Sequence, residues 1–331
     1  MAKSLEDTMS ALILTHADTD GLCSGALALS IYPDAEVIFT NPVEIAEDIR
    51  NARKHDRVIA CDVAIDISVA PVLKRTIDRI AAEKDVVYID HHPLPRGFSA
   101  SWLIHRLDAC GSLLTFNHFR DALDPDMSRV AMYGAIGDFR DTTPLAMEMA
   151  ERWDKRSLYY EAGTLSQGIE IDHKNLGYKR ALVRQLAVNK LPSQMEGLTE
   201  KAVLASRLEE TLRQRVERTV RQMTHLAYVV DPDGFISKAA IYARIYGSRP
   251  VGICAEYHDN KQVYDLSARA EAGVDLNILL NLAATRFGGH GGGHAAAGGG
   301  RIPAKSLDEF LAYLDILLGD ALEEKGKKVL A

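Results

Sequence analysis

Carboxylate and imidazole side chains follow three short apolar segments in the first half of the chain. The segments are ALIL, RVIAC and DVVYI, at residues 11–14, 57–61 and 85–89. The polar residues that come just after them are His16, Asp18, Asp20, Asp62, Asp90, His91 and His92. A further carboxylate, Asp138, ends the helical run MSRVAMYGAIG. Five aspartates brought to one place would repel one another strongly unless a cation lay among them.

The chemistry of these side chains favours a metal site. One aspartate after a strand is ordinary, because Asp caps turns and helix starts, but the same feature at three strand ends is not. Oxygen and imidazole ligands without thiolates are typical of sites for Mn²⁺, Mg²⁺ or Zn²⁺. Two ions about 3.5–4 Å apart, joined by one carboxylate, would activate a water and stabilise in-line displacement at phosphorus. The pattern therefore predicts a dinuclear centre that hydrolyses phosphoesters.

The elements that must position these residues alternate between strand and helix. We expect strands at 11–14, 36–39, 57–61 and 85–89, and helices at 21–32, 43–54 and 71–84. Alternation of this kind, with strands that are apolar throughout, indicates a parallel sheet covered on both faces. Ligands bind at the carboxyl ends of the strands in such sheets. The candidate ligands should therefore meet at one edge.

The rest of the chain predicts a helical stretch and a second, smaller domain. Residues 145–225 are mostly helical in pattern. Beyond them we expect strands at 225–230, 238–245, 250–257 and 262–270, a helix at 275–287, a glycine-rich loop at 288–300 and a last helix from about Ser306. The prediction is an α/β fold in three parts. These are a metal-binding domain at 1–190, helical over 145–190, a helical linker at 191–225, and an α/β domain with a mixed sheet at 226–331.

Composition narrows the class of protein. The chain has 331 residues, of which 47% are hydrophobic and 26% charged, as in soluble globular proteins. No apolar stretch reaches the roughly 18–20 residues needed to cross a bilayer, and the start, MAKSLEDTMS, lacks signal-peptide features. The four cysteines are scattered without a CxxC pair, which argues against a disulfide framework or zinc knuckle. We therefore expect a cytoplasmic protein without a membrane partner.

Five motifs together carry a resemblance to a known family. HADTDG, CD, IDHH and GAIGDFRD, in this order and on these elements, resemble the four motifs of the DHH phosphoesterase family. The segment GGGHAAAGG at 291–299 resembles the glycine-rich motif of the family's C-terminal DHH-associated domain. The resemblance covers nearly the whole chain, and it implies two divalent ions, with Mn²⁺ preferred and Mg²⁺ or Zn²⁺ as alternatives.

The resemblance also implies a role for each motif residue. One ion would be held by Asp18 and Asp138, the other by Asp20 and His91, with Asp62 between them. His16 lies two residues before Asp18, as in members with an HxDxDG pattern, and is a further ligand. His92 would contact the scissile phosphate or the nucleophile, and Asp90 would orient the imidazoles from behind. The substrate-binding residues would be Arg269, Gly291, Gly292, Gly293 and His294, because glycines let a phosphate approach backbone N–H groups closely.

Three functions fit this resemblance. The first is an Mn²⁺-dependent phosphoesterase that acts on short oligonucleotides or on nucleotide phosphates such as 3′-phosphoadenosine 5′-phosphate, like the nanoRNase branch. The second is a RecJ-like exonuclease on longer single strands, and the third is a catalytically inactive replication scaffold. The scaffold predicts missing ligands, whereas every motif aspartate is present.

Two features favour the short substrate over the long one. The net charge is −7 and aromatic residues make up 7% without a cluster that would stack many bases. Bacterial RecJ proteins also carry an extra nucleic-acid-binding domain, for which no residues are left over. Against this, residues 179–221 carry ten Lys or Arg and five Glu, which indicates either a solvated connector or a basic wall facing a polyanion. The expected partner is a short nucleic acid or nucleotide, and a homodimer is left open.

Overall fold

The structure is a computed structural model that describes residues 10–271 and 273–329. The sequence predicts that the N-terminal segment is not a signal peptide. This prediction concerns residues 1–10, and residues 1–9 lie outside the described residues. The chain divides into two compact units, 1–205 and 206–331, and this boundary falls inside the predicted 191–225 linker. Within the described residues, every helix is too short or too polar to span a bilayer.

The first unit is built on a five-stranded parallel sheet, as predicted. Its strand order is β2-β1-β3-β4-β5. The strands are β1 (Ala11–Thr15), β2 (Glu36–Phe39), β3 (Arg57–Cys61), β4 (Asp85–Asp90) and β5 (Leu103–His105). The register pairs Thr15 with Cys61, and Cys61 with Ile89. The central strands therefore end at the same level, which is what brings the residues after them together. The short β5 has no counterpart in the sequence-based prediction.

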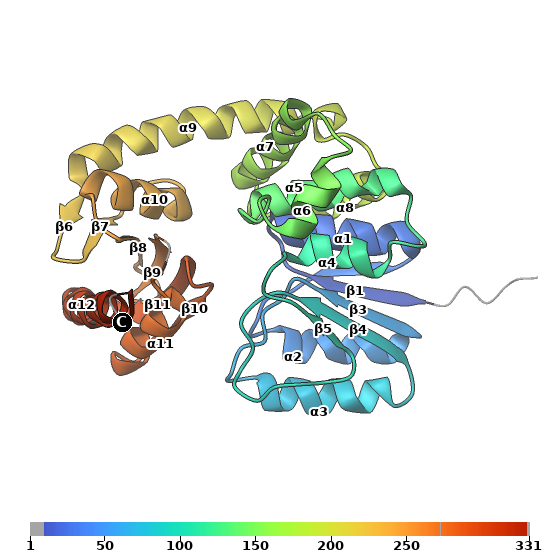
Figure 1. The fold of residues 1–331 in the computed structure, drawn as a ribbon, viewed down its shortest axis with the longest axis horizontal. Helices are drawn as coiled ribbons and strands as arrows, with labels where there is room; N and C mark the ends of the chain where they lie inside the picture. Colours follow the sequence, from blue (N-terminus) through green and yellow to red (C-terminus); the bar gives the residue numbers. More distant parts are fainter. Residues whose placement is uncertain (1–9, 272, 330–331) are drawn as a thin grey trace, which may run out of the picture. The chain divides into compact units, whose positions relative to one another are not determined.

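Helices cover both faces of this sheet (Figure 1). One face packs on α2 (Ile45–Asp48), the 3₁₀ helix Ile49–Lys54 and α3 (Ala70–Ala81) through Leu12, Leu14, Val58 and Ala60. The other face packs through Ile13, Ile59 and Ile89 on a helical layer. That layer comprises α1 (Thr19–Ile31), α4 (Gly111–His118), α5 (Ser128–Gly137), α6 (Pro144–Ala150), α7 (Lys155–Ile171) and α8 (Leu176–Ala187), with 3₁₀ helices at Pro125–Met127 and Pro192–Gln194. Successive strand residues thus alternate between two cores.

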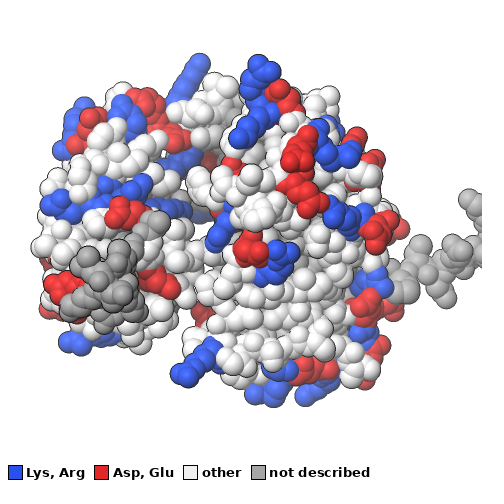
Figure 2. Space-filling model, in the orientation of Figure 1, with Lys and Arg blue, Asp and Glu red and all other residues white. Residues whose placement is uncertain are grey.

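The long helix α9 (Leu198–Thr219) belongs partly to each unit. Leu198 is buried in the core of the first unit, whereas Leu212 and Val216 are buried in a core of the second. Three of its five cations are paired with acidic groups, at Lys201–Asp172 (2.7 Å), Arg213–Glu210 (2.7 Å) and Arg215–Asp233 (3.1 Å). In Figure 2 acidic and basic side chains lie intermixed over the end of α9. The pairing favours the connector over the basic wall.

The second unit contains a six-stranded mixed sheet in the order β10-β11-β9-β8-β7-β6, in which only β7 and β8 pair in parallel. The strands are β6 (Arg221–Gln222), β7 (Leu226–Val230), β8 (Val251–His258), β9 (Val263–Ala270), β10 (His290–Gly293) and β11 (Ala297–Pro303). The helices are α10 (Ile236–Gly247), α11 (Leu276–Arg286), the 3₁₀ helix Ala304–Ser306 and α12 (Leu307–Val329). A smaller α/β domain with a mixed sheet was predicted here.

The prediction of a strand at 238–245 is wrong, because these residues belong to α10. The apolar run AAIYARI includes isoleucine and tyrosine, which favour strands. Its buried members are nevertheless Ala239, Ala240 and Ala243, which share one helical face. These small residues bring α10 so close to β8 that a Cβ at Gly252 would lie 2.2 Å from the Ala240 carbonyl oxygen. The helix is the crossover that a parallel β7–β8 pair requires.

The glycine-rich segment 288–300 is a β-hairpin and not a loop. Glycine disfavours strands, so sequence alone indicates a loop. The hairpin forms because β11 pairs with β9 along its full length, and α11 packs closely against it. A Cβ at Gly291 would lie 2.9 Å from the Leu280 carbonyl oxygen, and one at Gly298 would lie 2.5 Å from Leu280 Cδ1. A larger residue at Gly291 or Gly298 would clash with α11, which is one reason why these positions are glycine.

Candidate metal centre

The residues after β1, β3 and β4 converge at the carboxyl edge of the parallel sheet. The Nε2 atom of His91 lies 3.2 Å from Asp62 Oδ1, 3.7 Å from Asp138 Oδ2 and 3.8 Å from Asp20 Oδ2. His91, Asp62 and Asp20 are buried. Asp138 reaches the same place from the end of α5. The sequence motifs are thus brought together by the fold.

Three overlapping groups of ligand atoms occupy this edge. His16, Asp18 and Asp62 offer atoms that all lie within 4.8 Å of one another, and so do Asp20, Asp62 and His91. The third group is Asp62, Asp90 and His92. Asp62 belongs to all three groups, which is the position a bridging carboxylate would occupy. Among the described residues, the pair Asp18 and Asp138 does not form such a group, so their sharing of one ion stays a prediction.

Asp62 is held by an unusual backbone conformation. Its φ is 57°, in the left-handed region that few residues other than glycine adopt. Its N–H donates to the Ile89 carbonyl at 2.9 Å, so the strand pairing extends one residue further while the chain turns sharply. A Cβ at Gly111 would lie only 2.6 Å from the Asp62 Cβ. Backbone strain and close packing together fix the carboxylate at the sheet edge.

The N-terminus of α4 fixes Asp20. Its Oδ2 accepts a hydrogen bond from the Gly111 N–H at 2.7 Å, and its Oδ1 accepts one from the Ser112 N–H at 3.0 Å. These are free amides of the first helical turn, and the helix dipole favours a carboxylate there. Sequence reasoning missed this contact. The dipeptide Gly111-Ser112 starts the helix that follows β5. It is therefore a local signal of a helix N-terminus, where a carboxylate is favoured.

Three hydrogen bonds hold the loop that carries His16 and Asp18. The Gly21 N–H donates to Asp18 Oδ1 at 2.9 Å, which caps α1, and Thr15 Oγ1 donates to the Gly21 carbonyl at 2.6 Å. The ammonium of Lys179, on α8, donates to the Ala17 carbonyl at 2.5 Å. Lys179 is buried, and sequence reasoning placed it in a solvated or substrate-facing basic segment. No local pattern distinguishes it from its exposed neighbours.

Asp90 and His92 form a hydrogen-bonded pair beside the ligands. The Nδ1 atom of His92 lies 2.8 Å from Asp90 Oδ1, and its backbone N–H donates to Asp90 Oδ2 at 3.2 Å. Asp90 is fully buried. Burial acts to lower the pKa of His92, but the Asp90 carboxylate outweighs it, so that this pKa lies above its usual value. His92 is therefore suited to carry a proton near neutral pH.

Crowding of the carboxylates changes their protonation. Burial, followed by the charges of Asp20 and Asp18, raises the pKa of Asp138 to about 8. The same causes raise the pKa of Asp62 well above its ordinary value. Burial lowers the pKa of His91, which keeps its imidazole in the neutral form that binds metals.

These features are those of a divalent metal site. Asp138 Oδ2 is buried without a hydrogen-bond partner among the described residues. A cation at this edge would take the place of the protons that otherwise relieve the repulsion. Carboxylate oxygens and neutral imidazole nitrogens are also the donor set of Mn²⁺, Mg²⁺ and Zn²⁺ sites. The residues present therefore fit the metals that the sequence predicts.

The predicted substrate-binding residues lie together in the second unit. Gly291, Gly292 and Gly293 form β10, and His294 begins the turn to β11, with its N–H donating to the Ala297 carbonyl at 2.7 Å. Arg269 lies opposite Ala297 in the sheet register. Its guanidinium donates to the Ala268 carbonyl at 2.8 Å and to the Ser237 hydroxyl. The hairpin turn and the arginine thus share one end of the sheet.

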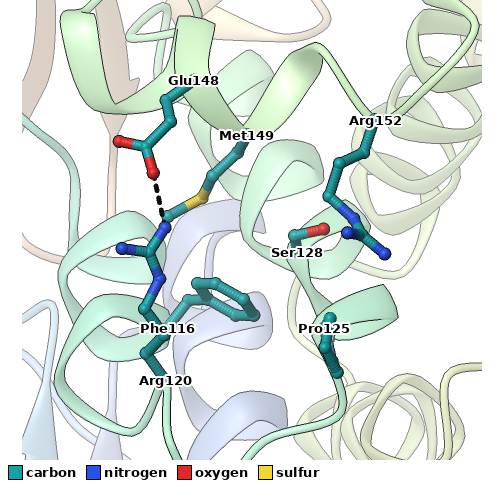
Figure 3. Close-up of a pocket in the computed structure, with 7 residues that line it drawn as sticks. All are labelled: Phe116, Arg120, Pro125, Ser128, Glu148, Met149 and Arg152. Atoms are coloured by element: carbon teal, nitrogen blue, oxygen red, sulfur yellow. Dashed lines mark hydrogen bonds and ion pairs between the residues drawn. The ribbon is translucent and has the colours of Figure 1, made fainter.

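A cavity of about 310 Å³ in the helical layer of the first unit is separate from the predicted site (Figure 3). Its lining residues are Phe116, Arg120, Pro125, Ser128, Glu148, Met149 and Arg152. Arg120 is paired with Glu148 at 2.5 Å, and Arg152 with Asp126 at 2.9 Å. Since both arginines are neutralised and none of the candidate ligands lines the cavity, we assign it no function.

Comparison with known proteins gives one family match and several similar structures. Residues 233–320 match the DHHA1 domain, and no curated protein matches the chain. RecJ from Thermus thermophilus in complex with Mn²⁺ is 14% identical, with a TM-score of 0.68 over 96% of this chain and 53% of RecJ. The chain thus spans about half the length of that protein. The Mg²⁺ complex of the same RecJ gives 13% identity and a TM-score of 0.62, over 96% and 50% of the two chains.

Two further structures are similar over most of their length. A DHH domain from a member of the S1p family of ribosomal proteins is 16% identical, with a TM-score of 0.71 over 93% of this chain and 86% of that one. A pGpG-specific phosphodiesterase from Vibrio cholerae is 15% identical, with a TM-score of 0.58 over 94% and 99% of the two chains. The resemblance to DHH-family phosphoesterases read from the sequence motifs is therefore confirmed, by a DHHA1 match in the second unit and by the fold of nearly the whole chain.

Proposed function

We propose that this chain is a metal-dependent phosphoesterase that hydrolyses short oligonucleotides or nucleotide phosphates. The observation that carries the proposal is the membership of Asp62 both in the group with His16 and Asp18 and in the group with Asp20 and His91. One carboxylate shared by two metal positions is the arrangement used for in-line displacement at phosphorus. We propose Mn²⁺ as the preferred ion, with Mg²⁺ and Zn²⁺ as alternatives.

The bound ions would lower the pKa of a water and stabilise charge on the phosphoryl oxygens. The protein residues have supporting roles that follow from their contacts. Asp62 offers oxygen atoms to both positions, and the two amides on Asp20 keep that carboxylate from rotating away. His92, held by Asp90, donates a proton to the phosphate or to the leaving oxygen through Nε2. The raised pKa of His92 supports this acidic role.

Substrate binding is assigned to the second unit. The hairpin residues Gly291, Gly292, Gly293 and His294, with Arg269, would hold the part of the substrate remote from the scissile bond. Gly292 supports this assignment, because a Cβ there would meet only Asn277 Oδ1, at 3.2 Å. Unlike Gly291 and Gly298, it is not held against the body of α11, so a ligand can approach its backbone.

The alternative is a RecJ-like exonuclease that acts on longer single strands. The fold supports either function, and the similarity to RecJ covers about half of that protein. The net charge of −7 favours the short substrate, and four of the ten cations of the 179–221 segment are paired or buried. A catalytically inactive scaffold is disfavoured, because all the candidate ligands are present and converge. The four buried, free cysteines agree with the cytoplasmic location that we propose.

A length series of substrates tests this proposal. Initial rates would be measured with Mn²⁺ on a dinucleotide, a five-residue oligonucleotide, a long single strand of RNA and of DNA, and 3′-phosphoadenosine 5′-phosphate. Rates that are highest on the shortest species are expected. Rates that hold or rise with length would support the RecJ-like alternative, and no metal-dependent cleavage of any substrate would contradict the proposed function.

A further inference from the structure

Phe139 is the most unusual apolar residue at the edge of the candidate metal centre. It follows Asp138 directly, and its side chain is 76% exposed. Its φ is 56°, in the left-handed region. A large aromatic side chain rarely adopts this conformation, because its Cβ crowds the backbone. Phe139 therefore bears two costs, exposure of apolar surface and backbone strain, and so exposed a ring gains little packing energy to offset them.

The local structure indicates which residue would be expected there. The Arg140 N–H donates to the Ala135 carbonyl at 2.7 Å, and the Phe139 N–H donates to the Ile136 carbonyl at 3.3 Å. These two bonds form a Schellman motif that ends α5, with Phe139 at the left-handed position that glycine usually occupies. The motif needs no side chain at this position. The aromatic ring is thus explained neither by the helix end nor by the protein core.

The position of Phe139 suggests a role in substrate recognition. Its neighbour on one side is Asp138, which lies 3.7 Å from His91 Nε2. Its neighbour on the other side is Arg140, whose Nε lies 3.7 Å from Asp138 Oδ2. The ring is thus carried by the residue that directly follows a candidate metal ligand, on the same exposed turn as a cation. A nucleobase attached to a phosphoester presents a flat apolar face of matching chemistry.

We propose that Phe139 stacks on the nucleobase next to the scissile phosphate and so makes the site selective for nucleotide phosphoesters over other phosphoesters. This inference rests on the proposed function, and it names the feature of the substrate that the site reads. Base stacking on an aromatic side chain tolerates any base, so the selectivity concerns the presence of a base and not its identity.

The test compares Phe139→Gly with the wild-type protein on two substrates. The first is a dinucleotide, and the second is the same dinucleotide without the base beside the scissile bond. Phe139→Gly is expected to raise KM for the dinucleotide roughly five- to a hundredfold, as loss of one stacked base does. KM for the abasic substrate should stay nearly unchanged, and kcat should change little on either substrate.

Stability measurements separate this role from a structural one. Phe139→Gly should leave the melting temperature unchanged or raise it, because glycine suits the left-handed position. Phe139→Trp should retain a low KM for the dinucleotide. The matched control is Val188→Ala. Val188 is equally exposed, at 76%. The next residue, Asn189, accepts a hydrogen bond from Arg129, which lies at the end of α5 opposite to Phe139.

The outcomes distinguish this inference from the proposed function. If wild-type protein cleaves both substrates and Phe139→Gly raises both KM values equally, or neither, the stacking inference is overturned while the proposed function stands. A lower melting temperature for Phe139→Gly together with equal losses on both substrates would assign Phe139 to structure and would also overturn it. If wild-type protein cleaves neither substrate with Mn²⁺, the inference is overturned, and the proposed function is overturned as well if no substrate of the length series is cleaved.

Discussion

Nε2 of His91 lies 3.2 Å from Oδ1 of Asp62, although the two residues are 29 positions apart in the sequence. The contact follows from strand register, since Cys61 at the end of β3 pairs with Ile89 in β4. Asp62 is the first residue beyond one strand, and His91 the first beyond the other. A neutral imidazole and a buried carboxylate at this distance can act as ligands of the same ion.

Asp90→Asn tests the pairing of Asp90 with His92. An amide keeps the size of the side chain but removes the charge that raises the pKa of His92. We expect kcat to fall roughly 10–100-fold, as loss of such an orienting partner does elsewhere. The alkaline limb of the pH–rate profile should move to lower pH. An unchanged pH profile with normal kcat would show that Asp90 does not control His92.

Gly111→Ala tests the close packing of α4 against the carboxylates. An added Cβ would lie 2.6 Å from Asp62 Cβ and 3.0 Å from Asp20 Oδ2. We expect a destabilisation of about 1–3 kcal/mol and weaker Mn²⁺ binding, measured by thermal unfolding and calorimetric titration. The matched control is Gly163→Ala on α7, where the added Cβ meets no atom within 4 Å. This control should stabilise the helix by about 0.5–1 kcal/mol. Equal effects of the two substitutions would contradict the packing described.

Lys179→Met tests whether the buried ammonium supports the loop of His16 and Asp18. Methionine retains much of the volume but leaves the Ala17 carbonyl without its donor. We expect a loss of about 1–3 kcal/mol in the free energy of unfolding and weaker Mn²⁺ binding. In contrast, Lys201→Met, which breaks a more exposed pair with Asp172, should cost less than about 1 kcal/mol. A Lys179 variant as stable as the Lys201 variant would argue against this role.

The stability of the metal-free protein should depend on pH through the crowded carboxylates. The pKa of Asp138 is raised from 3.8 to about 8, so the folded protein keeps a proton that the unfolded chain has lost above about pH 4. The contribution of this group to the free energy of unfolding is therefore greatest below pH 4 and falls as the pH rises to about 8. Asp62, whose pKa is also raised, acts in the same direction.

Metal ions should reverse this trend. Because Mn²⁺ binding must displace the proton from Asp138, Mn²⁺ affinity rises between pH 6 and pH 8 and protons are released on binding. The measurement is the increase in melting temperature caused by Mn²⁺ at each pH, with Asp138→Asn as the comparison. An increase that is the same at pH 6 and pH 8 in the unsubstituted protein would contradict the predicted protonation of these carboxylates.

The architecture of the first unit could be predicted because its signals are local. Apolar segments such as RVIAC match β3 residue for residue, and their alternation with helices implies a parallel sheet. The rule that ligands gather at strand ends then placed His91 near Asp62 without knowledge of side-chain contacts. In the second unit, local preference failed at 238–245 and at 288–300. In both segments the small residues are needed because α10 and α11 pack closely on the sheet, and they do not reflect a backbone preference of the segments themselves.

The contacts that hold the candidate ligands in place could not be predicted from the sequence for a similar reason. Lys179 and Gly111 act on residues about 160 and 90 positions away in sequence, at Ala17 and at Asp20. Nothing in the segment of Lys179 indicates such a partner, and the dipeptide Gly111-Ser112 indicates a helix start without indicating which carboxylate binds there. The left-handed backbone of Phe139 is likewise imposed by a helix end, because a large aromatic residue rarely adopts it, whereas Asp62 is of a residue type that tolerates this region.

The proposed function depends on Asp62 joining two metal positions, and Asp62→Asn alters that shared carboxylate alone. Asparagine keeps the size of the side chain and tolerates the left-handed backbone, so folding should be preserved and can be checked by thermal unfolding. The measurement is the number and affinity of Mn²⁺ ions bound per chain by calorimetric titration, with the rate of dinucleotide hydrolysis under the same conditions. Two ions are expected on the unsubstituted protein, and Asp62→Asn should weaken the binding of both ions and bring hydrolysis close to background. Two ions bound with unchanged affinity and a near-normal rate in the variant would contradict this role of Asp62.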